Sequence, residues 1–509
     1  MKTVRNELKI GVVLNYINMG VGNLIPIFYT PIMLRILGQS EYGLYKLSSV
    51  VTGYLGLISL GLGAAITRYL IKAATEGGEE AEKRMLGLFL IIFRFIALVA
   101  FIVGVIVMFH LDLWYEDSLS SEELQRMKIL VFIMVCNTAL SFSVSPYMSI
   151  VTAHEKFIFY QCMNILTTCI APIVNLIALY MGYASMGLAL SSLAIAVLVR
   201  IVYFIYVKKT MHITPCYRHL PTDCLKEIMV FSFWIFVANV VGQLYASTDT
   251  IMIGAIPSLA VTGVALYNVG IVFDHMVGGV SVGISSLLAP RINKMVFSGE
   301  SNEHLTEYSI LIGRLQCYMA SCLVVGFIIF GKPLIHFYVG DEYMDSYWVM
   351  LMVSVPKIIV LAQSACLSIV IAKNKHRFRS LVYLGVAIVN VIGTWLVLED
   401  WGVIGAAFMS GLSFFVGHGL FMNWFYWKKM DMDIWHFWKK MSQVCLVPLL
   451  LCVLCVMVRG YVDLYNIWVL LACMLGFMIV LFGLQWRFAF NDYEKTLVKL
   501  PLKRLNILK

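Results

Sequence analysis

Charged residues are scarce in this sequence. Only 13% of its 509 residues are Asp, Glu, Lys or Arg, while 61% are hydrophobic. A chain of this length would ordinarily hold about three soluble domains, but soluble domains cannot bury so much apolar surface. Nearly every window of ~19 residues is apolar instead, which is typical of a helical protein that crosses the membrane many times.

Long hydrophilic segments are also missing. The three longest are Leu111 to Arg126, Lys208 to Glu227 and Arg487 to Lys509, and each is too short to fold alone. A membrane enzyme such as a polysaccharide polymerase or ligase would need a large outer loop with clustered His, Arg or Asp. Because the sequence has no such loop, we expect no enzymatic activity.

Three further absences narrow the class of protein to which the chain can belong. Apolar runs such as Leu98 to Phe109 do not alternate with polar residues, which excludes the strands of a membrane barrel. No small-residue cleavage pattern follows the basic segment Met1 to Lys9, so we expect an uncleaved first span. Cys452 and Cys455 lie on an apolar helix, where cysteine is far more often a small hydrophobe than a metal ligand. We therefore expect no disulfide, no zinc and no cofactor.

The apolar runs themselves predict an all-α polytopic membrane protein with about fourteen spans. The spans are expected at 10–34, 44–72, 84–109, 127–151, 158–181, 185–207, 228–254, 264–289, 304–331, 346–372, 380–399, 402–427, 442–458 and 465–485.

Lysine and arginine are distributed unevenly between the predicted loops. With the N-terminus inside, the inner segments hold 27 of the 38 Lys and Arg residues. The outer loops hold Arg35, Arg126, Lys332 and Arg459. This positive-inside asymmetry places both termini in the cytoplasm. Basic loops facing anionic lipid headgroups also account for the net charge of +9 without a nucleic-acid partner.

Several stretches of the first half of the sequence recur in the second half. Asn15 to Arg68 recurs as Asn239 to Arg291, and Ser149 to Ala153 (SIVTA) recurs as Ser368 to Ala372 (SIVIA). Ordered matches at offsets of 215 to 224 indicate an internal repeat. Further matches at these offsets join Asn23 to Gln243, Tyr45 to Tyr267, Arg94 to Arg314, and Ile173-Val174-Asn175 to Ile388-Val389-Asn390.

The repeat unit contains six spans, which is an even number. Both copies should therefore enter the membrane from the same side and be related by an axis along the membrane normal. We expect an N-terminal lobe at 1–207, a cytoplasmic linker at 208–227, a C-terminal lobe at 228–430, and two extra helices with a basic tail at 431–509.

A few ionisable residues lie inside predicted spans, where charge is costly and usually faces a cavity or a partner. Asp249 and Asp274 are the acidic ones, and they are candidates for coupling to H⁺ or Na⁺. Asp274, ~15 Å from the outer end of its helix, could instead pair with Lys357 or Arg94. His275 is a third coupling candidate, although a lone histidine in a membrane span more often only forms a hydrogen-bonded contact with a neighbouring helix.

Uncharged polar residues in the first and seventh spans are a second group of candidates. Asn23 and its counterpart Gln243, with glycines nearby, could line a hydrated cavity or form hydrogen bonds between helices. Arg68 could face the same cavity or reach the inner headgroups. Arg94 and Arg314 occupy equivalent positions in both repeats, so we assign them to the fold and not to ligand binding.

Two motifs resemble a known family. Leu37-Gly38-Gln39-Ser40-Glu41-Tyr42-Gly43-Leu44-Tyr45 is followed by a span that ends in Gly61-Leu62-Gly63-Ala64-Ala65-Ile66-Thr67-Arg68, and Asp249, Ile251 to Gly254 and Gly263 to Tyr267 follow in the second repeat. The pattern is similar to the polysaccharide transporter family of Wzx-type oligosaccharide flippases. Their superfamily also contains multidrug and toxic compound extrusion antiporters and lipid II flippases. The resemblance covers residues 10–430.

The resemblance implies a two-lobed transporter of the bacterial inner membrane that works by alternating access. Its substrate would be an undecaprenyl-pyrophosphate-linked oligosaccharide, bound in a cationic cavity lined by spans one, two, seven and eight. Lipid II flippases carry arginines in their first span, whereas this chain has no basic residue between Lys9 and Arg35. The implied cationic residues are Arg35, Lys46, Arg68 and Lys357, with Asn23 and Gln243 beside them.

The main alternative is a cation-coupled drug antiporter of the same fold, in which Asp249 and Asp274 would bind H⁺ or Na⁺. Such antiporters should also have acidic residues in the spans of the first lobe, and the sequence has none there. For the flippase, the expected partners are the lipid-linked oligosaccharide, membrane lipid, and as further candidates a polysaccharide polymerase and glycosyltransferases.

Overall fold

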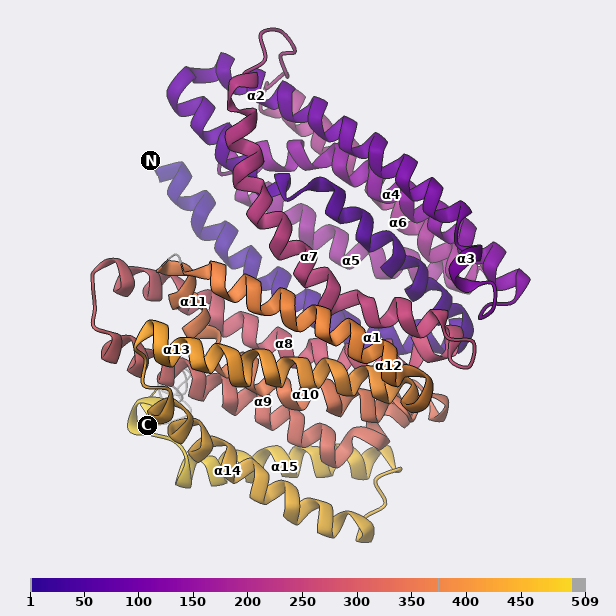
Figure 1. Ribbon diagram of the computed structural model, residues 1–509, viewed down its shortest axis with the longest axis vertical. Helices are drawn as coiled ribbons and strands as arrows, with labels where there is room; N and C mark the ends of the chain where they lie inside the picture. The colour runs from indigo at the N-terminus through magenta and orange to yellow at the C-terminus, as the bar shows by residue number, and fades with distance from the viewer. Residues whose placement is uncertain (1, 374, 497–509) are drawn as a thin grey trace. The chain divides into compact units, whose positions relative to one another are not determined.

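The computed structural model describes residues 2–373 and 375–496, and in this part of the chain it contains helices and connecting turns but no strand. The chain divides into two compact units, Met1–Asn268 and Val269–Lys509. The boundary falls within one long helix, α8 (Ala260–Phe297), and both units are visible in Figure 1 by the change from violet to orange.

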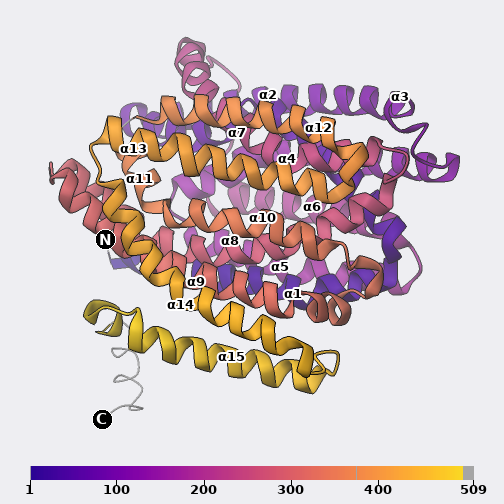
Figure 2. The same ribbon diagram turned by 60° about the horizontal axis from the view of Figure 1, so that its bottom comes forward.

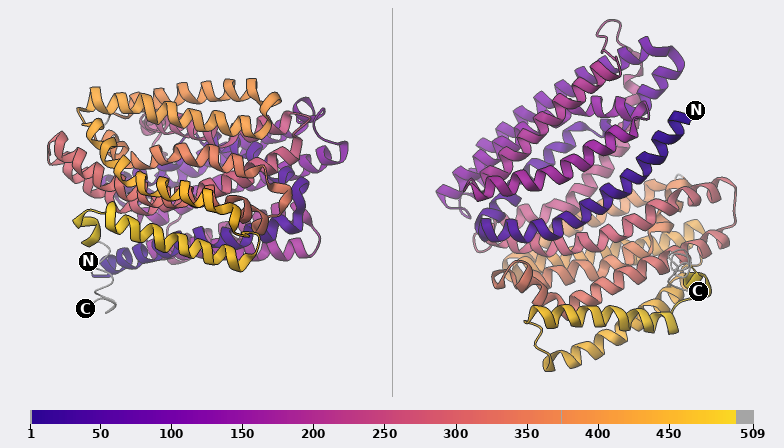
Figure 3. Two further views of the ribbon diagram at one scale, coloured as in Figure 1. Left: turned by 90° about the horizontal axis from the view of Figure 1, so that it is seen from below. Right: turned by 180° about the vertical axis from the view of Figure 1, so that it is seen from behind.

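The first unit is a bundle of long apolar helices (Figures 1 and 3). Its second helix packs along the fourth, and its first packs along the fifth. Side chains such as Leu70, Phe89, Phe93 and Ile150 form a core with almost no exposed surface. The elements are α1 (Lys2–Gly53), η1 (Tyr54–Ser59), α2 (Leu62–Phe109), α3 (Asp112–Tyr115), α4 (Ser121–Ala153), α5 (Phe157–Tyr180), α6 (Ala184–Ile205), η2 (Tyr206–Thr210), η3 (Thr222–Cys224) and α7 (Leu225–Ala255).

Glycine replaces a loop at several predicted connections. The connection expected between the spans 10–34 and 44–72 is a kink at one residue, Gly38 (φ 74°, ψ 175°), inside α1. A side chain is strained at such an angle, so glycine lets the chain turn without unwinding. Gly78 (φ 69°) and Gly402 (φ 56°) produce the same effect inside α2 and α12 (His376–Phe414).

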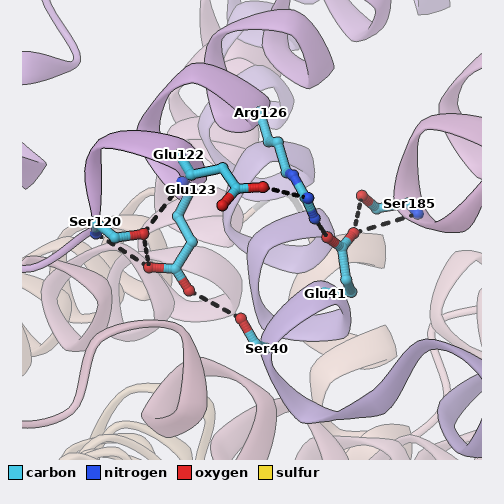
Figure 4. A network of polar contacts seen from close by, with 7 residues as sticks. All are labelled: Ser40, Glu41, Ser120, Glu122, Glu123, Arg126 and Ser185. Carbon is cyan, nitrogen blue, oxygen red and sulfur yellow. Dashed lines mark hydrogen bonds and ion pairs between the residues drawn. The ribbon is translucent and has the colours of Figure 1, made fainter.

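A polar network fixes the kink at Gly38 to neighbouring helices (Figure 4). The Glu41 carboxylate pairs with Arg126 at the start of α4 and accepts a hydrogen bond from the Ser185 hydroxyl at the start of α6. Ser40 donates to Glu123, 2.8 Å away, which also closes a capping box with Ser120. Residues of the Leu37 to Tyr45 motif thus join three helix ends on the predicted outer side.

Replacing Glu41 by Ala should therefore loosen the first unit. Glu41 is only 18% exposed and has two partners, Arg126 and Ser185, whose contacts with it would be lost, whereas Glu122, which binds the same Arg126 at 2.6 Å, is 76% exposed. We expect Glu41→Ala to cost about 1–3 kcal/mol and Glu122→Ala about 0.5 kcal/mol or less. Thermal unfolding of the purified protein in detergent measures both. Equal melting temperatures for the two variants would contradict this role for Glu41.

The second unit contains two interrupted helices. The tenth and eleventh helices meet at Gln363 with a bend of 49°, and the twelfth continues into a π-helix. The side-chain amide of Gln363, at the bend, donates a hydrogen bond of 2.8 Å to the side-chain oxygen of Asn423, just after the π-helix. After α8 the elements are α9 (Asn302–Tyr338), η4 (Asp341–Tyr343), α10 (Ser346–Ala362), α11 (Ser364–Ala372), α12, η5 (Phe415–Met422), α13 (Asn423–Met430), α14 (Ile434–Val458), η6 (Arg459–Tyr461) and α15 (Ile467–Phe488).

The last two helices run side by side (Figure 2) and pack on α9. Arg314 of α9 is 6% exposed and forms two contacts to Glu494, with Nε 2.6 Å from Oε1 and NH2 2.9 Å from Oε2. It also donates to the carbonyl of Ala489 at 2.6 Å. This network supports the structural role assigned to Arg314, whereas Arg94 is exposed beside the ring of Tyr217.

The all-helical membrane fold is confirmed. Among residues 2–373 and 375–496, eleven helices are long and apolar enough to span a membrane, or twelve if the bent pair α10 and α11 is one span. Two of these, 10–59 and 378–430, contain the kinks at Gly38 and Gly402, where the sequence predicts connections. The count of fourteen stays a prediction.

Two contacts recur at the repeat offset, one in each unit. His154 at the end of α4 lies 2.8 Å from Glu82 of α2, and Lys373 after α11 donates 2.6 Å to Asn302 of α9. Asn302 follows Glu82 by 220 positions, and Lys373 follows His154 by 219. These spacings match the sequence repeat, although the predicted lobe boundaries themselves stay a prediction.

Candidate functional site

A largely buried charge pair joins α8 to α10 in the second unit. The Lys357 ammonium lies 2.5 Å from Oδ2 of Asp274 and 3.3 Å from its backbone carbonyl oxygen. The Asp274 side chain is 7% exposed and that of Lys357 is 17% exposed. Two of the predicted site residues, one acidic and one basic, are therefore partners, which is the pairing that the sequence left as an alternative.

Two glycines allow this pair to form. Gly270 and Gly278 lie four residues before and after Asp274, so all three share one face of α8. A Cβ at Gly270 would lie 2.6 Å from Val349 of α10, and one at Gly278 would lie 3.3 Å from Nζ of Lys357. Small residues at this spacing let helices approach closely in a membrane.

Asp249 lies in the first unit, in a polar cluster on α7. Its side chain is buried, and Oδ2 accepts a hydrogen bond of 2.6 Å from the Tyr267 hydroxyl of α8. The adjacent Thr248 hydroxyl lies 2.6 Å from that of Tyr54 in η1. Asp249 is therefore held as a hydrogen-bonded carboxylate between two helices, close to where α7 meets the interruption between α1 and α2.

Gln243 belongs to the same part of α7. Its side-chain amide donates 3.0 Å to Ser247, and its backbone carbonyl lies 3.5 Å from the Tyr54 hydroxyl. Gly53, just before η1, would place a Cβ 3.1 Å from the Gln243 amide nitrogen. Gln243 and Asp249 thus lie six residues apart, less than two turns, on a helix that packs against η1.

The cationic candidates of the first unit are placed beside aromatic rings. Lys46 is partly buried, with its ammonium 5.6 Å from the centre of the Tyr42 ring. Arg68 is exposed, with its guanidinium 4.6 Å from the centre of the Phe231 ring of α7. Such contacts hold a cation in place while leaving it able to bind an anion.

The remaining candidates lie at exposed positions. Asn23 and Arg35 are exposed on α1, and His275 is exposed on α8 next to the buried Asp274. Sequence reasoning missed Gly270 and Gly278, although their spacing around Asp274 was a usable signal. It also missed the contact between Tyr54 and Thr248, for which the sequence holds no signal because 194 positions separate them.

Two solved structures of membrane transporters share this fold. The lipid II flippase MurJ in an inward closed conformation matches with a TM-score of 0.73 at 15% identity, covering 94% of this chain and 99% of that one. An inward-facing multidrug resistance MATE family transporter of the MOP superfamily matches with a TM-score of 0.57 at 12% identity, covering 83% and 99%. The chain therefore has the fold of this superfamily.

The family is narrower than the fold. Residues 10–296 match the family described as "Polysaccharide biosynthesis protein", so the chain belongs to that family. A relative from Shigella flexneri, named "Putative O-antigen transporter", is 20% identical over 418 residues, covering 81% of this chain and 96% of the relative. The family resemblance read from the Leu37 to Tyr45 and Gly61 to Arg68 motifs is thus confirmed.

Proposed function

We propose that this protein is a flippase that moves an undecaprenyl-pyrophosphate-linked oligosaccharide from the inner to the outer leaflet of the bacterial cytoplasmic membrane. Membership of the polysaccharide biosynthesis family and the name of the Shigella relative support this assignment. The polar head of such a lipid cannot cross ~30 Å of hydrocarbon unaided. A protein that exposes a binding site first to one side and then to the other removes that barrier.

The observation that carries the proposal is a lysine inside an apolar helix. Lys357 lies within α10 and is 17% exposed. A lysine so placed offers a charge-assisted hydrogen bond to a phosphate oxygen. Lys46, Arg68 and Arg35 provide further positive charge for the head group, and Asn23 and Gln243 provide hydrogen bonds to sugars.

The transport cycle needs an energy source, for which we propose H⁺ or Na⁺. Asp249 and Asp274 are buried carboxylates, and His275 lies beside the second. Binding of a cation at either carboxylate would change the local charge on α7 or α8. The proposed organisation is two six-helix lobes, 1–207 and 228–430, joined by 208–227 and followed by 431–509, and the recurring contacts of His154 and Lys373 support it.

A strain that lacks this protein should lose its surface polysaccharide and accumulate the lipid-linked oligosaccharide on the cytoplasmic side. The unaltered chain should restore both, and Arg68→Ala should not, because the loss of one charge-assisted contact weakens binding roughly 10- to 100-fold. Arg94→Ala is the matched control, since Arg94 is also exposed beside an aromatic ring. If the Arg68→Ala variant restores export, Arg68 does not bind the substrate.

A second candidate function is a cation-coupled multidrug antiporter, which the MATE-like fold and the buried Asp249 and Asp274 favour. The same strain separates the two functions. An antiporter would protect cells against organic cations such as ethidium and leave the polysaccharide unchanged, and Asp249→Asn would abolish that protection. We expect no change in ethidium resistance.

A further inference from the structure

The pair between Asp274 and Lys357 has an unused acceptor. Oδ1 of Asp274 is buried and has no hydrogen-bond partner in the described part of the chain, while Oδ2 binds the ammonium. A carboxylate used only as a structural partner would normally have both oxygens satisfied, because an unsatisfied buried acceptor costs free energy. The pair is therefore less stable than its short distance alone would indicate.

The helix faces around the pair are in register. Gly270 lies against Val349 and Gly278 lies against Lys357. The two contacts are eight residues apart on both helices, so α8 and α10 run in the same direction here. The glycines bring α10 so close that the lysine side chain reaches the Asp274 carbonyl as well as the carboxylate. The positions four residues before and after Asp274 on α8 are both glycine, so α10 can bring the ammonium beside the acidic side chain.

Taking charges out of water is costly, and the cost is recovered only while each charge keeps a partner. The ammonium of Lys357 can be neutralised by the Asp274 carboxylate or by a phosphate oxygen. An ammonium has three N–H donors, but the two anions repel each other beside it, so each weakens the binding of the other. Phosphate carries more negative charge than a carboxylate and offers several acceptor oxygens. A diphosphate can therefore replace the carboxylate, although it must first break the existing pair.

We propose that Asp274 is the resident counter-ion of Lys357, and that it competes with the anionic phosphate head group of a lipid substrate for this lysine. This inference rests on the proposed flippase function and names a positioning role for Asp274 within it. The carboxylate keeps the lysine neutralised between transport events and lowers its affinity for the substrate, so that a bound head group can also be released. Gly270 and Gly278 leave room for α10 and its lysine beside Asp274.

The test measures binding of farnesyl pyrophosphate to the full-length protein in detergent by titration calorimetry. Asp274→Asn should bind it roughly tenfold more tightly than the unaltered protein, because the lysine is no longer held by a competitor. Lys357→Met should bind it at least roughly tenfold more weakly. The double variant should be as weak as Lys357→Met, since without the lysine there is nothing for Asp274 to compete for.

The controls separate competition from a structural role. Asp400→Asn removes an exposed acid of α12 and should leave the affinity unchanged. Asp274→Ser is the second variant in case Asn prevents folding, and a protein that unfolds with both substitutions would overturn the proposal in favour of a purely structural pair. Unchanged or weaker binding by a folded Asp274 variant would also overturn it.

The outcome for the proposed function is distinct. If Lys357→Met loses binding but Asp274→Asn gains nothing, the competition is wrong and the flippase assignment stands. If the unaltered protein restores no surface polysaccharide in the deletion strain, the flippase assignment itself fails, whatever the affinities for farnesyl pyrophosphate.

Discussion

Cells that carry only the Lys357→Ala variant should export no detectable surface polysaccharide. Lys357 is the charged group that lies within α10, and it has a charged partner on α8. In the proposed site, its removal takes away a charge-assisted contact to the substrate, worth ~1.5–3 kcal/mol, and so should reduce affinity roughly 10- to 100-fold. Immunoblotting of the membrane fraction and staining of the surface polysaccharide measure insertion and export separately.

Lys357→Ala also leaves the Asp274 carboxylate buried without its partner, which can destabilise the protein by about 3–5 kcal/mol. The double variant Lys357→Ala/Asp274→Ala removes this cost and should regain stability but not export. Lys332→Ala is the matched control, because Lys332 lies beside the rings of Tyr347 and Trp348 at the end of α9, far along the chain from this pair. Export by the double variant at the normal rate would show that Lys357 does not bind the substrate.

Glu494→Ala should strongly destabilise the protein. Arg314 and Glu494 are 6% and 3% exposed, and the carboxylate accepts two hydrogen bonds from the guanidinium. The same carboxylate accepts from the Asn491 backbone at 2.8 Å, and the Asn491 side chain accepts from the Glu494 backbone at 2.8 Å. Loss of Glu494 thus leaves a buried arginine unpaired, at a cost of about 3–5 kcal/mol.

Thermal unfolding in detergent measures this loss. The paired substitution Arg314→Met/Glu494→Leu should recover most of the stability, because apolar side chains of similar size can replace a buried ion pair at little cost. If Glu494→Ala melts at the temperature of the unaltered protein, the C-terminal segment does not depend on Arg314. Since Arg314 is outside the proposed substrate site, the paired variant should retain export.

Much of the fold could be predicted from the sequence, because a membrane imposes its own length and composition on every spanning helix. The apolar runs gave the helices, and Gly38 and Gly402 mark two of the predicted connections. The sequence did not predict that these connections would be kinks of a single residue inside continuous helices. That outcome depends on which hydrogen bonds the neighbouring helix ends can supply, as Glu41 does for Arg126 and Ser185.

The candidate site was also predictable from the sequence only in part. The sequence alone determined which ionisable side chains lie in the membrane, since the cost of burying charge makes Asp249, Asp274 and Lys357 conspicuous in apolar runs. Only the tertiary structure decided their partners: Tyr267 for Asp249, and Lys357 for Asp274. Asp274 and Lys357 are 83 positions apart in the chain. They meet because Gly270 and Gly278 let two helices approach closely, and such an approach depends on packing in three dimensions and not on any local pattern.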